Sequence, residues 1–239
     1  MKLPSSRQAV FGDFEEFAAS VPGISIVATP LAPAPFSARL TLLKLRELEL
    51  IVGHSTPLMF TGGLNTGSAR IVLPLEQTET FRLNGLVVRP GDVAVFGPGA
   101  GCDGTWPTNA NWASLVLPAA TLPPLLEVPP HSPLRRVGAH SVLRASQETW
   151  AEVASLVTAA YQVAVEEPQV FMVAEAQCGL RADLLDALRG LLATTHQTGA
   201  AKAHTTVPGR QRIIRAVEDN LRADPGRAQS TRTSAPPSA

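Results

Sequence analysis

The stretch that decides the fold is Leu83-Asn84-Gly85, then Val88-Arg89-Pro90-Gly91-Asp92, then Val93-Ala94-Val95-Phe96-Gly97-Pro98-Gly99. Asn84-Gly85 predicts a two-residue hairpin turn, because both residues tolerate the positive φ angles that such turns require. Pro90-Gly91-Asp92 predicts a second turn, which leads into a short strand with Val93 and Val95 on one face. Tight turns between short apolar strands are typical of the closing half of a small β-barrel.

Short apolar or alternating runs continue on both sides of this stretch, and Pro, Gly or Asn separates nearly all of them. Many short strands at such spacing favour a sandwich or barrel over alternating strand–helix units. A short helix is predicted before them over residues 13–21, with Asp13 at its start. We expect strands at residues 24–26, 40–45, 48–52, 70–75, 80–83, 86–88, 93–96 and 112–117.

Helical periodicity begins after a proline-rich connector that follows Leu117. Apolar residues at spacings of three and four predict a helix over Gln147–Val165, with Ser146 as its N-cap. A second helical stretch is predicted from residue 168 to about residue 195, with a weak point at Gly179.

The apolar stripe of this second stretch includes Leu184, Leu188 and Leu191. Such stripes usually cover the core of their own domain, but antiparallel helices from two subunits can also pair along one. The residues alone leave both interpretations open. The three leucines are therefore candidates for the interface of a homodimer.

The last periodic segment is Gln211–Ala223, where Ile213, Val217 and Leu221 share one face. Residues 224–239 are mostly Ala, Arg, Ser, Thr and Pro without periodicity, and such a composition buries too little apolar surface to order itself. We expect a disordered tail there.

The composition sets outer limits on function. The chain has 239 residues, 45% of them hydrophobic, and a formal net charge of zero, which indicates no general attraction to nucleic acid or anionic membranes. Cys102 and Cys178 are too few for a disulfide framework. No run reaches the roughly 18 apolar residues of a membrane span, and no signal peptide is expected before Asp13. We expect a cytoplasmic protein without a membrane anchor.

The histidines argue against the metal site that barrels of this kind often hold, because metal ligands must converge on one ion. No two of the five histidines are adjacent or two residues apart, and only His54 lies among the predicted strands. Gly-x-Ser-x-Gly, phosphate-loop and dinucleotide-binding motifs do not occur either. We expect no metal, no other cofactor and no catalytic residue.

This order of features resembles AraC-type bacterial transcription regulators with a cupin-like N-terminal regulatory domain. The resemblance rests on the run from Asn84-Gly85 to Pro98-Gly99, on Trp112-Ala113-Ser114-Leu115 and on Arg210–Leu221. It implies an α+β fold, with a cupin-like β-barrel, then a helical pair and one C-terminal helix. In such regulators the barrel binds a small effector or mediates dimerisation, and two helix-turn-helix units at the C-terminus bind DNA.

Four regions follow from this resemblance. They are a cupin-like regulatory domain over residues 1–130, a helical dimerisation region over 131–198, a linker with the first helix of an incomplete DNA-binding domain over 199–223, and the tail over 224–239. A helix-turn-helix needs a recognition helix, whose pattern residues 227–239 lack. We expect a regulator truncated before its DNA reader, through a feature of the gene or a shifted reading frame, with DNA binding lost or nonspecific.

The predicted function is effector sensing and dimerisation rather than catalysis. A small effector usually binds in an apolar pocket that holds one or two polar groups. Chosen by residue type, the candidates for lining that pocket are Phe36, His54, Phe60, Arg70, Phe81 and Trp106. The alternative is a small cupin-fold enzyme, which would need a metal or a nucleophile–base pair, so stoichiometric bound metal would favour it.

Overall fold

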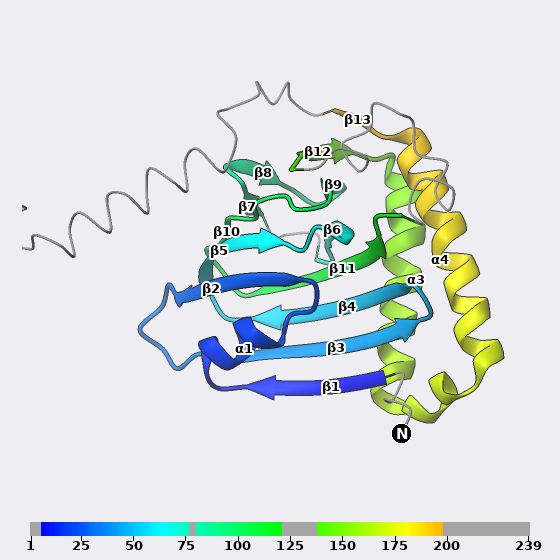
Figure 1. Ribbon diagram of the computed structural model, residues 1–239, viewed down its shortest axis with the longest axis horizontal. Helices are drawn as coiled ribbons and strands as arrows, with labels where there is room; N and C mark the ends of the chain where they lie inside the picture. Colours follow the sequence, from blue (N-terminus) through cyan, green and yellow to red (C-terminus); the bar gives the residue numbers. More distant parts are fainter. Residues whose placement is uncertain (1–5, 77–79, 121–137, 198–239) are drawn as a thin grey trace, which may run out of the picture. The chain divides into compact units, whose positions relative to one another are not determined.

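Two antiparallel sheets and a pair of long helices make up residues 6–76, 80–120 and 138–197, the part of the chain that the computed structural model describes (Figure 1). The larger sheet has eight strands, in the order β1 (Ser6–Phe11), β3 (Ala38–Leu45), β4 (Leu48–Ser55), β11 (Ala110–Pro118), β6 (Ser68–Pro74), β9 (Asp92–Phe96), β12 (His140–Arg144) and β13 (His196–Gln197). The smaller sheet has five, in the order β2 (Ile24–Pro30), β5 (Leu58–Leu64), β10 (Gly104–Trp106), β7 (Phe81–Leu83) and β8 (Leu86–Val88).

The larger sheet is the middle one of three layers. The helices α3 (Gln147–Glu166) and α4 (Ala174–Thr194) pack on one face, and the smaller sheet packs on the other together with α1 (Phe14–Ser20). In β6, Ile71 and Leu73 belong to the core under the helices, whereas Val72 belongs to the core between the sheets. Since successive residues point to opposite faces, a strand covered on both sides is largely apolar, and in β6 Arg70 is the exception.

Both predicted turns are confirmed. Asn84 and Gly85 have φ angles of 50° and 78° and connect β7 to β8, whose residues Leu83 and Leu86 pair. Gly91 has a φ of 83°. The Asp92 amide donates to the Arg89 carbonyl at 2.8 Å, and the Asp92 carboxylate accepts from the Arg89 amide at 2.9 Å. Each turn therefore adopts the conformation that its sequence favours.

The predicted fold class, cupin-like strands followed by helices, is confirmed, but the expected closure into a barrel is wrong. The two sheets stay separate hydrogen-bonded units that face each other as a sandwich. Turn and alternation signals are local, so they define hairpins without deciding whether the outer strands of two sheets pair. Five strands were also missed from the sequence: β1, β5, β10, β12 and β13.

The helix predictions hold in part. Asp13 caps α1 by accepting from the Glu15 and Glu16 amides at 2.8 Å, and Ser146 caps α3 by accepting from the Thr149 amide at 3.2 Å. Gly179, predicted as a weak point or a break, does not break the helix, because α4 runs through it. The chain breaks earlier, where the 3-10 helix η2 (Pro168–Met172) ends at Val173.

The region predicted as helical over residues 131–198 also contains β12, which pairs with β9 of the larger sheet. Residues 1–200 fall in one compact unit, so the helices share that unit with the strands. Among the described residues, no helix is both long and apolar enough to cross a membrane. The predicted helix over 211–223, the tail over 224–239 and most of the proline-rich connector lie outside the described residues.

The leucine stripe lies in the chain's own core. Leu184, Leu188 and Leu191 are each 0% exposed and pack in the cluster formed by both helices and the larger sheet. Side chains without exposed surface do not reach a second subunit. Dimerisation itself stays a prediction, and it would require a different surface from these three leucines.

Candidate functional site

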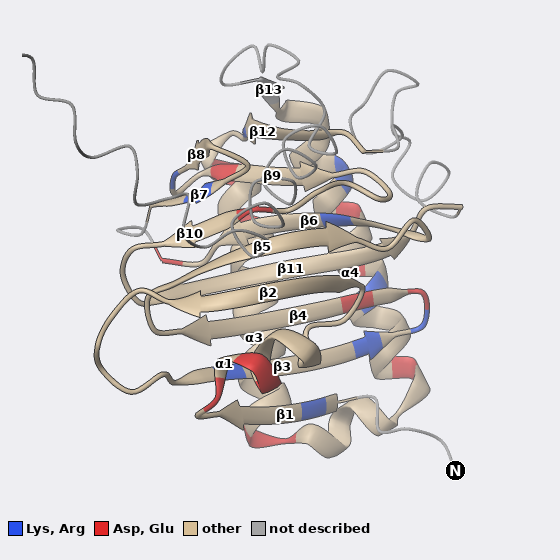
Figure 2. Cartoon of the chain, turned by 60° about the vertical axis from the view of Figure 1, so that its left-hand side comes forward, with Lys and Arg blue, Asp and Glu red and all other residues tan. Residues whose placement is uncertain are grey.

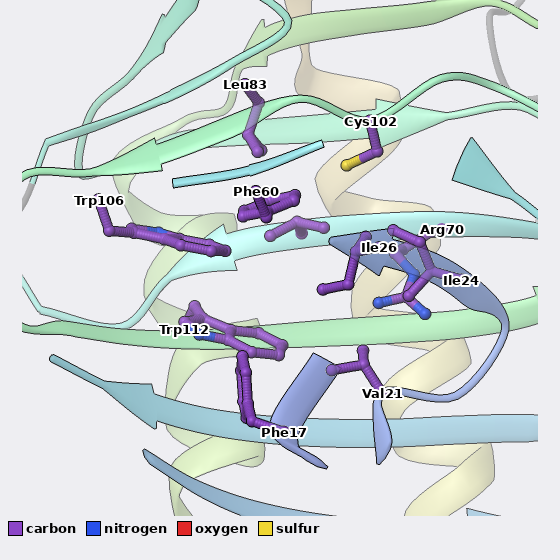
Figure 3. A pocket seen from close by; sticks show the side chains of 11 residues that line it. Phe17, Val21, Ile24, Ile26, Phe60, Arg70, Leu83, Cys102, Trp106 and Trp112 are labelled. Carbon is purple, nitrogen blue, oxygen red and sulfur yellow. The ribbon is translucent and has the colours of Figure 1, made fainter. Parts of the chain in front are cut away.

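A pocket lies between the two sheets, where strands from both meet α1 (Figure 3). The space open to the centres of water-sized molecules is about 40 Å³. Its walls are hydrocarbon and aromatic except at three side chains with N–H groups and one thiol, namely Arg70, Trp106, Trp112 and Cys102. The site is therefore a small apolar pocket that contains a single charged side chain.

A stack of aromatic rings forms one wall of the pocket. The Phe60 and Trp106 rings stack with centroids 4.6 Å apart, and Trp106 and Trp112 are nearly parallel at 6.0 Å and 13°. The Phe81 ring also contacts Trp106, with centroids 5.8 Å apart and a tilt of 56°. The indole Nε1 atoms of Trp106 and Trp112 are buried and have no hydrogen-bond partner among the described residues.

Two glycines make room for this aromatic wall. Gly53 pairs across the sheet with Trp112, and a Cβ atom at Gly53 would lie 2.2 Å from the indole ring. Gly104 pairs with Phe60, and a Cβ atom there would lie 2.1 Å from the phenyl ring. Both rings thus lie flat over the backbone of a neighbouring strand, which is possible only where that strand lacks a side chain.

Arg70 on β6 supplies the charge. Its side chain is 4% exposed, and Figure 3 shows it entering the pocket on the side opposite Trp106 and Trp112. Its Nη2 donates to the Pro22 carbonyl, while Nε is buried without a partner. No carboxylate oxygen of the described residues lies within 4.0 Å of its guanidinium nitrogens. The facing strands β2 and β5 and the adjacent strand β11 carry no charged residue, and Asp92 of the other adjacent strand, β9, pairs with Arg144 (Figure 2).

Burial changes the acidity of the two titratable groups in the pocket. It lowers the pKa of Arg70 well below its ordinary value, to about 10, which leaves the guanidinium charged at neutral pH. It raises the pKa of the Cys102 thiol to about 12, partly offset by the attraction of Arg70. Because the thiolate is the nucleophilic form, Cys102 is an unreactive thiol at neutral pH. The backbone of Cys102 donates to the Gly62 carbonyl at 2.9 Å, which joins this bend to β5.

The structure brings together three of the six residues predicted for the pocket. Phe60, Arg70 and Trp106 line it. Phe81 is not among the lining residues but contacts Trp106, and Phe36 packs against Phe17 with centroids 5.7 Å apart.

His54 lies elsewhere, at the end of β4, where its Nδ1 is 2.7 Å from the Asn111 Oδ1. The sequence prediction missed Trp112 and Cys102. The alternation of side chains along β11 could have indicated Trp112. Its neighbour Ala113 faces the helices, so Trp112 points to the other face of the sheet, toward the pocket.

The described residues contain no group of three or more His, Cys, Asp or Glu side chains that could hold a metal ion. The groups that the pocket offers are N–H donors and apolar surface, and these suit the binding of an organic molecule.

No family model matches the chain, and no curated protein does either. Solved structures do match. The AraC-like transcriptional activator CuxR superposes with a TM-score of 0.57 over 92% of this chain and 80% of that chain, at 14% identity. The fold is therefore similar to that of an AraC-like activator.

Two isolated cupin domains match over a shorter part of the chain. The cupin-2 domain Rru_A2000 from Rhodospirillum rubrum matches 41% of this chain and 71% of its own length, with 20% identity and a TM-score of 0.26. A cupin 2 conserved barrel domain protein from Rhodopseudomonas palustris matches 40% of this chain and 72% of its own length, with 13% identity and a TM-score of 0.28.

Proposed function

We propose that the chain is the effector-sensing regulatory part of an AraC-type transcription regulator. The observation that carries the proposal is the small apolar pocket between the two sheets, with one buried cation and an aromatic wall. The likeness of the fold to the AraC-like activator CuxR supports it over nearly the whole chain. An apolar pocket with few polar groups suits the recognition of a small organic molecule.

Two strands of the larger sheet connect this pocket to the helical layer. Val72 lines the pocket, and its neighbour Ile71 on β6 packs under the helices. Trp112 lines the pocket, and Ala113 on β11 packs under the helices. A ligand that moves the inward side chains of these strands therefore also strains the packing of α3 and α4. This is a physical route by which binding shifts the population of two helix arrangements.

Side chains also join the helices to the sheet at its edge. The Gln8 amide of β1 donates to the Ala164 carbonyl of α3 at 3.0 Å. Arg181 of α4 pairs with Glu47, which lies in the turn between β3 and β4. These contacts hold the helical pair close to the sheet, so that a movement of the sheet reaches the helices rather than being lost in a loose connection.

The proposal is that the pocket binds its ligand without changing it chemically. The Cys102 thiol has a pKa of about 12 and stays protonated, and Arg70 stays charged, so neither group suits nucleophilic or acid–base work near pH 7. Homodimerisation and the loss of specific DNA binding remain predictions. The second of these depends on residues outside the described part of the chain.

A matched pair of variants on β2 tests whether the pocket is an effector site. Ile26 lines the pocket, whereas the adjacent Val27 is 69% exposed on the outer face. We expect a screen of small metabolites by thermal unfolding to find a compound that raises the Tm of the wild type and of Val27→Phe. Ile26→Phe fills the pocket and should lose this response.

Hydrogen exchange then tests the route to the helices. With the compound bound, we expect slower exchange in β6 and in the helices α3 and α4 of the wild type. Equal ligand-induced Tm shifts in both β2 variants would contradict the assignment of the pocket. A bound compound that left exchange in α3 and α4 unchanged would contradict the regulatory role.

A further inference from the structure

The polar N–H groups that line the pocket are all hydrogen-bond donors. Arg70, Trp106 and Trp112 present N–H donors, and the other lining side chains are hydrocarbon apart from the Cys102 thiol. The Nε of Arg70 and both indole Nε1 atoms are buried without a partner among the described residues. Buried donors are normally satisfied, so a molecule that binds here gains most if it brings acceptors.

The charge in the pocket points to an anionic acceptor. A buried cation is normally paired, because moving a charged group out of water costs far more free energy than moving a neutral group. The described residues place no carboxylate within ion-pair distance of Arg70. Glu49 attracts Arg70 from farther away, and its carboxylate lies 3.9 Å from the Lys44 ammonium. Within the described residues, the buried Arg70 guanidinium therefore has no carboxylate in contact with it.

The size and the walls of the pocket limit what carries the acceptor. The space open to the centres of water-sized molecules is only about 40 Å³, which favours a small ligand. The aromatic wall of Phe60 and Trp106 offers apolar contact but no further charge. A carboxylate with a short hydrocarbon chain matches both features, since guanidinium groups favour planar carboxylates.

We propose that the effector is a short-chain monocarboxylate whose carboxylate pairs with Arg70 and whose hydrocarbon chain lies against Phe60 and Trp106. This assignment rests on the proposed function, in which the pocket is the effector site. It specifies the class of effector, from acetate to butyrate, and it names Arg70 as the residue that selects the charge.

The test compares acids with their uncharged counterparts on the full chain. Acetate, propionate and butyrate are titrated into the protein by calorimetry, and propionamide, butyramide and butanol serve as neutral probes of the same size. We expect binding of the acids in the millimolar range or tighter, and at least about tenfold weaker binding of the neutral probes. Sodium chloride at matched ionic strength shows whether any small anion suffices.

Two variants of Arg70 and one control complete the experiment. Arg70→Met removes the charge while keeping an unbranched apolar side chain, and we expect it to lose at least about tenfold in affinity for the acids. Arg70→Lys keeps the charge and should retain part of the affinity. Arg39→Met removes an exposed arginine from β3 and should bind like the wild type. Circular dichroism shows that each variant is folded, and the comparison of acids with amides in the wild type depends on no variant.

The outcomes separate the carboxylate assignment from the assignment of the pocket as an effector site. Selective binding of the acids that Arg70→Met abolishes supports the carboxylate assignment. Equal binding of acids and neutral probes, unchanged in Arg70→Met, overturns the carboxylate assignment but leaves the pocket as an effector site. Full competition by chloride also overturns it, because the site would then take any small anion. If neither the acids nor any compound of the metabolite screen binds, the proposed function fails as well.

Discussion

Replacing Arg70 by methionine should make the protein more stable in the absence of ligand. Burial lowers the pKa of the Arg70 guanidinium from its ordinary value to about 10, which destabilises the charged form by about 3 kcal/mol. The variant loses the hydrogen bond from Nη2 to the Pro22 carbonyl, which contributes about 1.5–3 kcal/mol. Methionine keeps the apolar contacts of the arginine stem and adds a buried methyl group, which offsets about 1 kcal/mol of that loss. We expect the free energy of unfolding to rise by about 1–3 kcal/mol.

Urea denaturation followed by far-UV circular dichroism measures this change. Arg39→Met is the control, because this exposed arginine lies on the same sheet and its replacement should change stability by no more than about 0.5 kcal/mol. A loss of more than about 1 kcal/mol in Arg70→Met, with an unchanged control, would refute the reasoning. It would mean that the folded protein already compensates the buried charge, and the case for an anionic ligand would weaken with it.

The same comparison has a defined pH dependence. The native-state pKa of Arg70 lies below that of the unfolded chain, so the unfolded chain binds more protons between pH 10 and 12.5. Wild-type stability from this group therefore rises with pH across that window. The gain in free energy of unfolding of Arg70→Met over the wild type should be complete below pH 10 and should shrink above it. Urea unfolding curves of both proteins at pH 8 and pH 10.5 measure this change.

Four further predictions follow from the packing and the chemistry. Leu188→Ala should lower the free energy of unfolding by about 2–5 kcal/mol, because this side chain is 0% exposed, and light scattering should show the same mass as for the wild type. Gly104→Ala should cost about 1–3 kcal/mol in urea denaturation because its methyl group meets the Phe60 ring, whereas Gly179→Ala, with open space in α4, should gain up to about 1 kcal/mol. The Cys102 thiol should react with iodoacetamide at pH 8 about a thousandfold more slowly than an unburied cysteine, and an equal rate by mass spectrometry would contradict its raised pKa. Fluorescence anisotropy with duplex DNA at physiological salt should show only weak nonspecific binding, and a nanomolar, sequence-dependent Kd would be the opposite outcome.

The candidate site was only partly predictable, and the reason is geometric. Residue type alone selected Phe60, Arg70 and Trp106, which line the pocket, together with His54, which lies at the end of β4 beside Asn111. Aromatic and charged residues look alike in a sequence whether they point between the sheets or away from them. The pairing of strands decides which direction each one takes.

The sequence by itself determined the local structure of this protein. Asn84-Gly85 dictated a hairpin because few residues adopt positive φ angles, and Asp13 and Ser146 dictated helix starts because their side chains accept from the free amides there. These signals depend on neighbours within a few residues. The folded chain therefore adopts the local conformations that these signals predict.

Only the tertiary structure decided that the two sheets stay open and that Leu184, Leu188 and Leu191 face the chain's own sheet. It also decided that the unpaired cation of Arg70 faces the stacked rings of Trp106 and Trp112. Each of these features joins residues that are far apart in sequence. The energies of such contacts depend on how several strands register against one another, which no local pattern specifies.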